Sequence, residues 1–221
     1  MGYCHRWARP TTITKTEFEA FARDVQAICK GAEEKGIDLA GPDGRAATEP
    51  EITGEIVALN GSDNQRRGKW TTSEPLGLVW PIPDAGIEDP DSDPAADVTE
   101  GVWAGGESIK APVAPIASDG KAHGEYESFI IQRETPPSSV GVSRRTPADV
   151  RASFCKTNFR PYDIVVAGCL IAFRQHVTGA VIGTDGGAAQ WINSQILCWN
   201  RCGYGFDVEF CEGSVYEAFV D

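Results

Sequence analysis

The ten residues from Ile164 to Phe173 carry no charged side chain, and this apolar run constrains the fold more than any other feature of the chain. Pro161 lies just before the run and favours the first turn of a helix. A helix that is apolar on nearly every side must be surrounded by other elements. We therefore predict a central buried helix from Pro161 to about His176. The run is about half of the ~20 residues that a membrane-spanning helix needs, which indicates a non-membrane protein.

A second helix is predicted over residues 14–35. Thr14 and Glu17 have the spacing of a capping box, in which each side chain accepts a hydrogen bond from the other residue's backbone. Gly36 provides a stop at the other end. The apolar residues between them recur at helical spacing; they are Phe18, Phe21, Ala22, Val25, Ile28, Cys29 and Ala32.

Shorter patterns predict the remaining elements. Thr146, Pro147 and Asp149 form a helix-start signal, so a short helix is expected from there to about Cys155. Strands are expected at residues 3–7, 51–60, 126–132, 177–183 and 206–211, an extended piece at 37–39, a turn at 41–44 and a helix at 188–201. The absence of a regular βαβ repeat in this order predicts an α+β fold with a single mixed or antiparallel sheet, packed by three to four helices.

Residues 62–124 are interpreted as a long Pro-rich acidic insertion within one domain that spans residues 1–221. Half of the chain's 14 prolines lie between Pro75 and Pro115, and residues 84–107 contain eight acidic residues but no lysine or arginine. Prolines exclude a regular helix and suit a central strand poorly. We expect loops here, with a short hairpin around Leu76–Trp80 as one option.

Charge and cysteine content restrict the partners and the compartment. The net charge of −12 argues against direct binding to nucleic acid or to an anionic membrane, and it leaves open a basic protein partner. The seven cysteines are an odd number and are spread along the chain, and no secretory signal precedes Cys4. These features favour free thiols and a cytoplasmic location.

A basic cluster gives the clearest candidate for a binding site. Arginine and lysine pair well with phosphate, so Lys156 and Arg160 at the start of the central helix can form an anion site. The alternative is internal pairing of these cations with Glu127 and Asp163. The cluster consists of Arg144, Arg145, Arg151, Lys156 and Arg160.

Other motifs are weaker. The segment 183–187 (Gly-Thr-Asp-Gly-Gly) resembles a phosphate-binding turn, but a turn in which Thr184 or Asp185 caps the next helix is favoured. Cys198 and Cys202 lie one helical turn apart without a second cysteine pair, so no metal site is predicted. Cys155 with His123 or His176 is a candidate nucleophile–base pair. No neighbouring residue in the sequence marks Cys155 as reactive, which favours a buried thiol. No cofactor is predicted.

Several motifs together resemble an uncharacterised family of bacteriophage and bacterial proteins. Its members begin Met-Gly-Tyr-x-His-x-Trp and carry an FCKT…PYD block, and the likeness covers roughly residues 1–61 and 125–205. The motifs that carry it are residues 1–7 (MGYCHRW), 40–44 (AGPDG), 58–61 (ALNG), 127–129 (ESF), 154–163 (FCKTNFRPYD), 184–186 (TDG), Trp191 and 203–205 (GYG).

The resemblance implies a phage or prophage context and a set of residues that share one cleft. These are His5, Trp7, Asn60, Glu127, Lys156, Thr157, Tyr162, Asp163 and Asp185. We expect a phage accessory protein for host takeover or anti-defence, which binds a basic host or defence protein or sequesters a small anionic ligand. An enzyme acting on a nucleotide-like substrate, with Glu127 or Asp163 as base, and a structural part of a phage particle are the alternatives.

Overall fold

The computed structural model describes residues 4–64, 98–102, 108–112, 126–134, 150–157, 160–185 and 191–209. The helices in these ranges are α1 (Lys15–Glu33), α2 (Asp163–His176) and α3 (Ile192–Cys202). The strands are β1 (Cys4–Pro10), β2 (Leu39–Ala40), β3 (Glu51–Ile52), β4 (Ile56–Gly61), β5 (Val98–Val102), β6 (Ser108–Pro112), β7 (Phe129–Gln132), β8 (Val150–Lys156) and β9 (Val181–Thr184).

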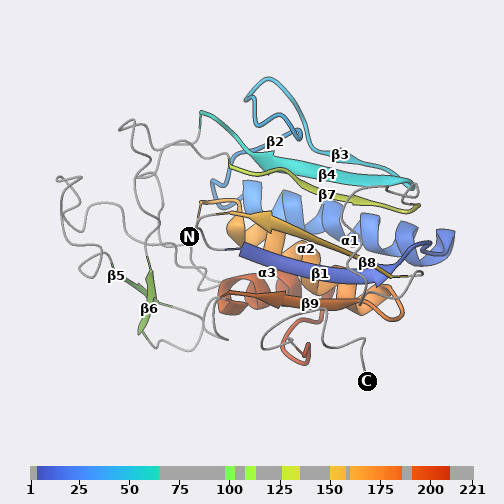
Figure 1. The fold of residues 1–221 in the computed structure, drawn as a ribbon. Coiled ribbons are helices and arrows are strands. Elements are labelled where there is room, and N and C mark those ends of the chain that lie inside the picture. Colours follow the sequence, from blue (N-terminus) through green and yellow to red (C-terminus); the bar gives the residue numbers. More distant parts are fainter. Residues whose placement is uncertain are drawn as a thin grey trace.

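The strands other than β5 and β6 form two antiparallel sheets that lie side by side as one layer, and the three helices cover one face of it (Figure 1). These two sheets and the three helices are called the body below. One sheet has the order β8-β1-β9, and the other has the order β2-β4-β3 with β7 also paired to β4. β5 and β6 pair separately within the insertion. The α+β class is confirmed, whereas the prediction of a single sheet is wrong.

The two sheets meet where β7 lies beside β8. The Glu127 amide donates to the Lys156 carbonyl at 3.3 Å, and the Ile13 amide donates to the Arg133 carbonyl at 3.1 Å, so backbone hydrogen bonds connect the sheets near both ends of β7. Between these points the Trp7 and Phe129 rings pack with their centroids 5.2 Å apart. The layer is therefore continuous in packing although its hydrogen-bonded ladder is divided.

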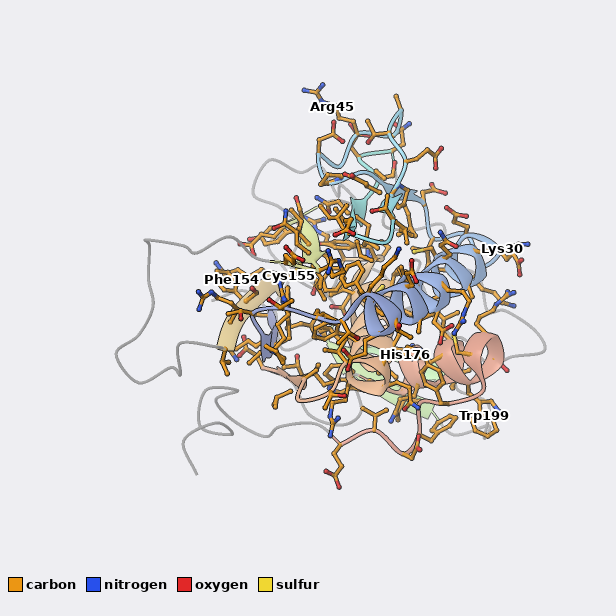
Figure 2. The ribbon with its side chains drawn as sticks, turned by 90° about the vertical axis from the view of Figure 1, so that its right-hand side faces the viewer. Lys30, Arg45, Phe154, Cys155, His176 and Trp199 are labelled. Carbon is orange, nitrogen blue, oxygen red and sulfur yellow. The ribbon has the colours of Figure 1, made fainter. Side chains whose placement is uncertain are left out.

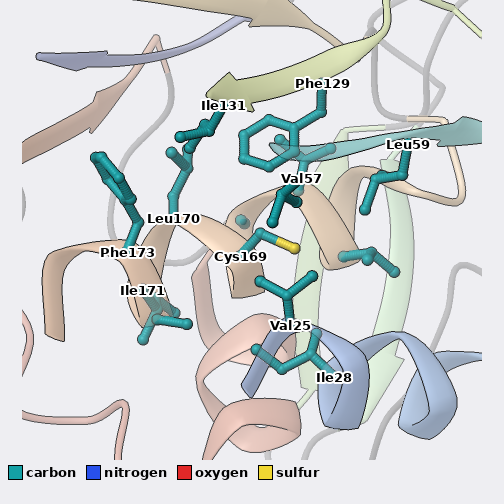
Figure 3. Packing of buried hydrophobic residues seen from close by; sticks show 14 of the residues in the cluster. Val25, Ile28, Val57, Leu59, Phe129, Ile131, Cys169, Leu170, Ile171 and Phe173 are labelled. Carbon is teal, nitrogen blue, oxygen red and sulfur yellow. The ribbon is translucent and has the colours of Figure 1, made fainter. Parts of the chain in front are cut away.

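Helix α2 lies at the centre of the core. Its eleven consecutive residues from Asp163 to Phe173 are buried between α1, α3 and the sheet layer (Figure 3), which confirms the predicted central helix. Gly168 permits the close approach of its neighbours, because a Cβ at this position would lie 3.2 Å from Ile28 Cγ2 and 3.6 Å from Cys198 Sγ. No helix in the described part of the chain has the length and apolar content needed to cross a membrane.

Helix α1 begins as its sequence predicts. Thr14 is the N-cap, and its hydroxyl accepts a hydrogen bond from the Glu17 amide, while the Glu17 carboxylate accepts from the Thr14 amide at 3.1 Å. The other carboxylate oxygen of Glu17 accepts from the Thr178 amide at 3.1 Å. The capping box therefore also ties the start of α1 to the turn between α2 and β9.

Because of Glu17, the free energy of unfolding is expected to decrease at acidic pH. Hydrogen bonds from Thr14 and Thr178 lower the pKa of Glu17 from 4.5 to about 2. The stabilisation is therefore fully present above pH 4.5 and is lost as the pH falls towards 2. Because solvent screens this carboxylate, we expect a contribution of about 1 kcal/mol.

Urea unfolding of the wild type and of Glu17→Gln across this pH range measures the contribution. The wild type should be the more stable protein at pH 6, and the difference should shrink as the pH approaches 2. A difference that is the same at both ends of the range would contradict the assignment, since glutamine does not titrate.

Local patterns misassigned three segments. Residues 150–156 form β8 and not the end of a helix, because all seven pair with β1. The strand expected over 51–60 is a hairpin of β3 and β4, whose turn is closed by the Thr53 amide donating to the Ile56 carbonyl at 2.8 Å. Residues 206–209 are not a strand. The predictions for residues 76–80, 84–97, 146–149, 188–190 and 210–211 lie outside the described residues.

Candidate functional site

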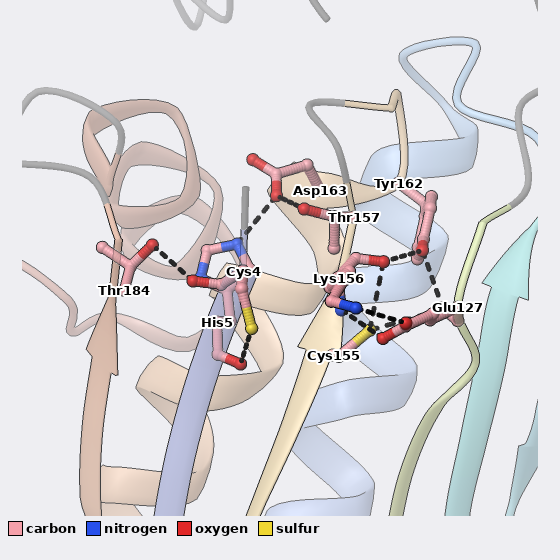
Figure 4. A network of polar contacts seen from close by, with 9 residues as sticks. All are labelled: Cys4, His5, Glu127, Cys155, Lys156, Thr157, Tyr162, Asp163 and Thr184. Carbon is pink, nitrogen blue, oxygen red and sulfur yellow. Dashed lines mark hydrogen bonds and ion pairs between the residues drawn. The ribbon is translucent and has the colours of Figure 1, made fainter. Parts of the chain in front are cut away.

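The candidate residues gather where β1 begins, where β8 and β9 end, and where α2 begins (Figure 4). The strand pairing places these ends together, because β1 is the central strand of its sheet and pairs with both neighbours. The short loop after β8 then leads directly into α2. The polar side chains of these ends form two adjoining groups, one around Asp163 and one around Glu127.

The Asp163 group is a buried set of three side chains. Asp163 is the first residue of α2, where the helix dipole favours a carboxylate. His5 Nε2 lies 2.7 Å from Asp163 Oδ1, and the Thr157 hydroxyl donates a hydrogen bond to the same oxygen. The His5 ring meets the Trp191 ring edge-on, with centroids 5.4 Å apart. This group therefore joins β1, the β8–α2 loop, α2 and the start of α3.

The Glu127 group joins the two sheets. The carboxylate of Glu127 accepts a hydrogen bond from the Lys156 amide at 2.8 Å, and its other oxygen lies 3.5 Å from Lys156 Nζ. The buried Tyr162 hydroxyl donates to the Glu127 carbonyl at 2.7 Å and lies 3.3 Å from the Lys156 carbonyl. Tyr162 thus contacts the backbone of both sheets, while the Lys156–Glu127 ion pair is partly exposed.

The two cations of the predicted anion site differ in their surroundings. The side chain of Lys156 is 44% exposed, and its ammonium lies 5.8 Å from the centre of the Phe154 ring as well as beside Glu127. Arg160 is buried, with 4% of its surface exposed. Of the two interpretations offered by the sequence, these contacts favour internal pairing for Lys156.

Three other candidates lie around the two groups without joining them. Trp7 belongs to the hydrophobic core. The Asn60 side chain exchanges two hydrogen bonds with the backbone of Tyr126, at 3.3 and 3.2 Å. Asp185 forms an ion pair with Arg6, and its amide donates to the Cys4 carbonyl at 3.0 Å. Asp185 does not cap α3, whose N-cap is Trp191.

Cys155 has the environment of a structural thiol. Burial, followed by the neighbouring Glu127, raises the pKa of Cys155 far above its ordinary value, which disfavours the thiolate that a nucleophile requires. The thiol donates to the Glu127 carbonyl at 3.3 Å. His176, one of the two bases considered from the sequence, lies at the other end of α2, and His123 lies outside the described residues.

Sequence reasoning missed a second histidine–carboxylate pair. His176 Nε2 lies 2.6 Å from Asp24 Oδ2, and the Tyr204 hydroxyl donates to the same oxygen at 2.8 Å. Burial opposes ionisation of Asp24, yet hydrogen bonds from His176 and Tyr204 hold its pKa below the ordinary value. A histidine–aspartate pair therefore stands at each end of α2. No local motif signals the second pair, since its members are far apart in sequence.

Several large apolar side chains are exposed. Phe154 and Trp199 lie on opposite sides of the body (Figure 2), and Trp199 packs against Phe206 with centroids 5.9 Å apart. Within the described ranges, no group of three or more His, Cys, Asp or Glu side chains is arranged to hold a metal ion.

Fold and site together define an α+β protein. In it, the Asp163 and Glu127 groups connect the strand ends to the buried helix α2 by hydrogen bonds. No family model, curated protein or solved structure matches the chain.

Proposed function

We propose that the protein acts by binding, and that its acidic insertion docks on a basic surface of a host or defence protein in a phage-infected cell. The phage context comes from the sequence resemblance.

The observation that carries the proposal is the contact between Asn60, in β4, and Tyr126, shortly before β7. These two residues form what we call the neck of the insertion. β4 and β7 are antiparallel neighbours paired from Ile56–Gln132 to Leu59–Phe129. The chain leaves the body after β4 and returns just before β7. Asn60 closes this exit, because its side chain exchanges hydrogen bonds with the amide and carbonyl of Tyr126. The chain thus leaves for the insertion and returns from it through a closed pair of strand ends.

The negative charge of the insertion is the feature that selects a basic protein partner in this proposal. Eight acidic residues without a lysine or arginine between positions 84 and 107 create a concentrated negative charge. Complementary charge speeds association and selects partners, and its effect weakens as salt screens it.

Removing the charge of the insertion tests the proposal. The variant replaces the eight acids of residues 84–107 with asparagine and glutamine, and the control replaces the exposed body residues Glu19, Glu49 and Glu51. Each immobilised protein is incubated with host lysate at rising salt. We expect the wild type and the control to retain a basic protein that salt elutes, and the neutralised insertion to retain none. Equal retention by the neutralised variant at every salt concentration would refute the proposal.

Deleting residues 66–122 provides a second test of the same arrangement. Because Asn60 and Tyr126 hold the neck closed, a short glycine–serine turn should replace the segment without unfolding the body. Circular dichroism and thermal unfolding are expected to show a folded body that has lost the salt-sensitive partner. An unfolded deletion variant would show that the insertion is part of the core.

A further inference from the structure

Two aromatic side chains lie together on the surface at the end of α3. Trp199 is 55% exposed and Phe206 is 51% exposed. Their ring centroids lie 5.9 Å apart, with an angle of 58° between the ring planes. Trp199 lies at the surface in the view of Figure 2. Large aromatic rings contribute most to cores and to binding interfaces, so an exposed pair in mutual contact points to a ligand.

Phe206 is held beside Trp199 by the two residues that precede it in the chain. The Tyr204 hydroxyl donates a hydrogen bond to Asp24 Oδ2 at 2.8 Å, which ties this part of the chain to α1. Gly205 has a φ of 138°, and a Cβ at this position would lie 3.0 Å from a backbone carbonyl oxygen of α3. Glycine permits both this conformation and this close approach. The aromatic pair is therefore preorganised, which lowers the entropy cost of binding.

The exposed charges that follow the aromatic pair in the chain are negative. Asp207 comes directly after Phe206, Glu209 lies two residues further on, and both side chains are exposed. Arg201, the basic residue in the last turn of α3, forms an ion pair with Glu34 of α1. Carboxylates beside aromatic rings complement a cationic group, because the ring faces are themselves negative. The surroundings of the pair therefore favour a positively charged ligand.

We propose that Trp199 and Phe206 form a binding site for an arginine side chain of a partner protein. A guanidinium group stacks on aromatic faces and is more weakly hydrated than an ammonium group, so it leaves water more readily. The attraction extends to about 6 Å from a ring centroid. Since the two centroids are 5.9 Å apart, one guanidinium group can interact with both rings, while Asp207 supplies the opposite charge. This site does not rest on the proposed docking of the acidic insertion.

Nuclear magnetic resonance of the full chain tests the site with a small probe, a Gly-Arg-Gly tripeptide blocked at both ends. The signal observed is the indole N–H resonance of Trp199, which the spectrum of a Trp199→Leu variant identifies. We expect the tripeptide to shift this resonance in a saturable way. The same tripeptide with citrulline, which has the shape of arginine without its charge, should produce no saturable shift. Equal responses to the two tripeptides, or no response to either, would overturn the proposal.

Phe206→Leu removes one ring and keeps an apolar side chain, and Phe154→Leu, at an aromatic residue that is 58% exposed elsewhere, is the matched control. We expect Phe206→Leu to bind the arginine tripeptide about two- to fivefold more weakly, as for the loss of one exposed cation–π contact. The control should bind like the wild type. Unchanged binding by Phe206→Leu would overturn the proposal.

The full chain with its eight insertion acids neutralised separates this site from the proposed function. At about 0.15 M salt, which screens distant charges, this variant should shift the Trp199 resonance with the wild-type affinity for the arginine tripeptide. Such a result supports the aromatic site whatever the insertion binds. Loss of the response in this variant would show that the insertion holds the tripeptide, and it would overturn the aromatic site.

Discussion

Replacing Leu170 with alanine is expected to lower the free energy of unfolding by about 2–5 kcal/mol. Leu170 lies in the middle of the buried run of α2, with 0% of its surface exposed (Figure 3). Truncation removes apolar contacts and leaves a cavity beside Ile131 of β7, next to which Figure 3 shows Leu170. Chemical denaturation of the purified protein measures the loss.

Arg174→Ala is the control for this prediction, since it truncates an exposed side chain one turn further along the same helix. Its effect is expected to stay within about 0.5 kcal/mol. Leu170→Met, which nearly conserves volume, should cost less than about 1.5 kcal/mol. If Leu170→Ala were as stable as the arginine control, α2 could not be the centre of the core.

Replacing Asp163 with alanine is expected to cost about 3–5 kcal/mol, because it breaks a buried pair by removing one partner. His5 and Thr157 both direct a hydrogen bond to this carboxylate and are themselves buried. The substitution also removes a negative charge from the start of α2. Asp163→Asn keeps one acceptor oxygen and should fall between the wild type and alanine.

The matched control for Asp163→Ala is Lys156→Ala. Lys156 belongs to the adjoining group, but its ion pair with Glu127 is partly exposed, so its loss should cost less than about 1 kcal/mol. Thermal and denaturant unfolding of the two variants side by side separates a buried structural centre from a surface pair. Similar small losses for both would mean that the Asp163 group does not stabilise the fold.

The elements predicted correctly from the sequence are those specified by nearby residues. Thr14 and Glu17 lie three positions apart and begin α1 without help from the rest of the chain. The uncharged run of α2 can be satisfied only in a core, so its burial follows from the run alone. Both signals are contained within a single element, and no information about its neighbours is needed to interpret them.

The elements predicted wrongly depend on partners that are distant in sequence. A local helix-start signal precedes residues 150–156, but pairing of every one of them with β1 makes them a strand. The division of the layer into two sheets likewise depends on how β7 meets β8. The Thr53–Ile56 turn, by contrast, had a local signal in Thr53-Gly54 that was overlooked.

The candidate site shows the same limit. The resemblance gathered His5, Thr157 and Asp163 into one set, and the structure brings them into contact across 158 positions of sequence. It could not show that the set is buried, because burial depends on the elements packed around it. The Asp24–His176–Tyr204 group was missed since its three members come from α1, α2 and the chain after α3.

The closed neck at Asn60 and Tyr126 has a consequence for how such a protein can change over time. When two strand ends are already held together, lengthening the segment between them costs only loop entropy, about 0.6 kcal/mol for each doubling. In the proposed arrangement, evolution can therefore replace, shorten or extend that segment while the body is kept. Proteins that share this body are expected to differ most in length and charge between β4 and β7, and so to address different targets from one scaffold.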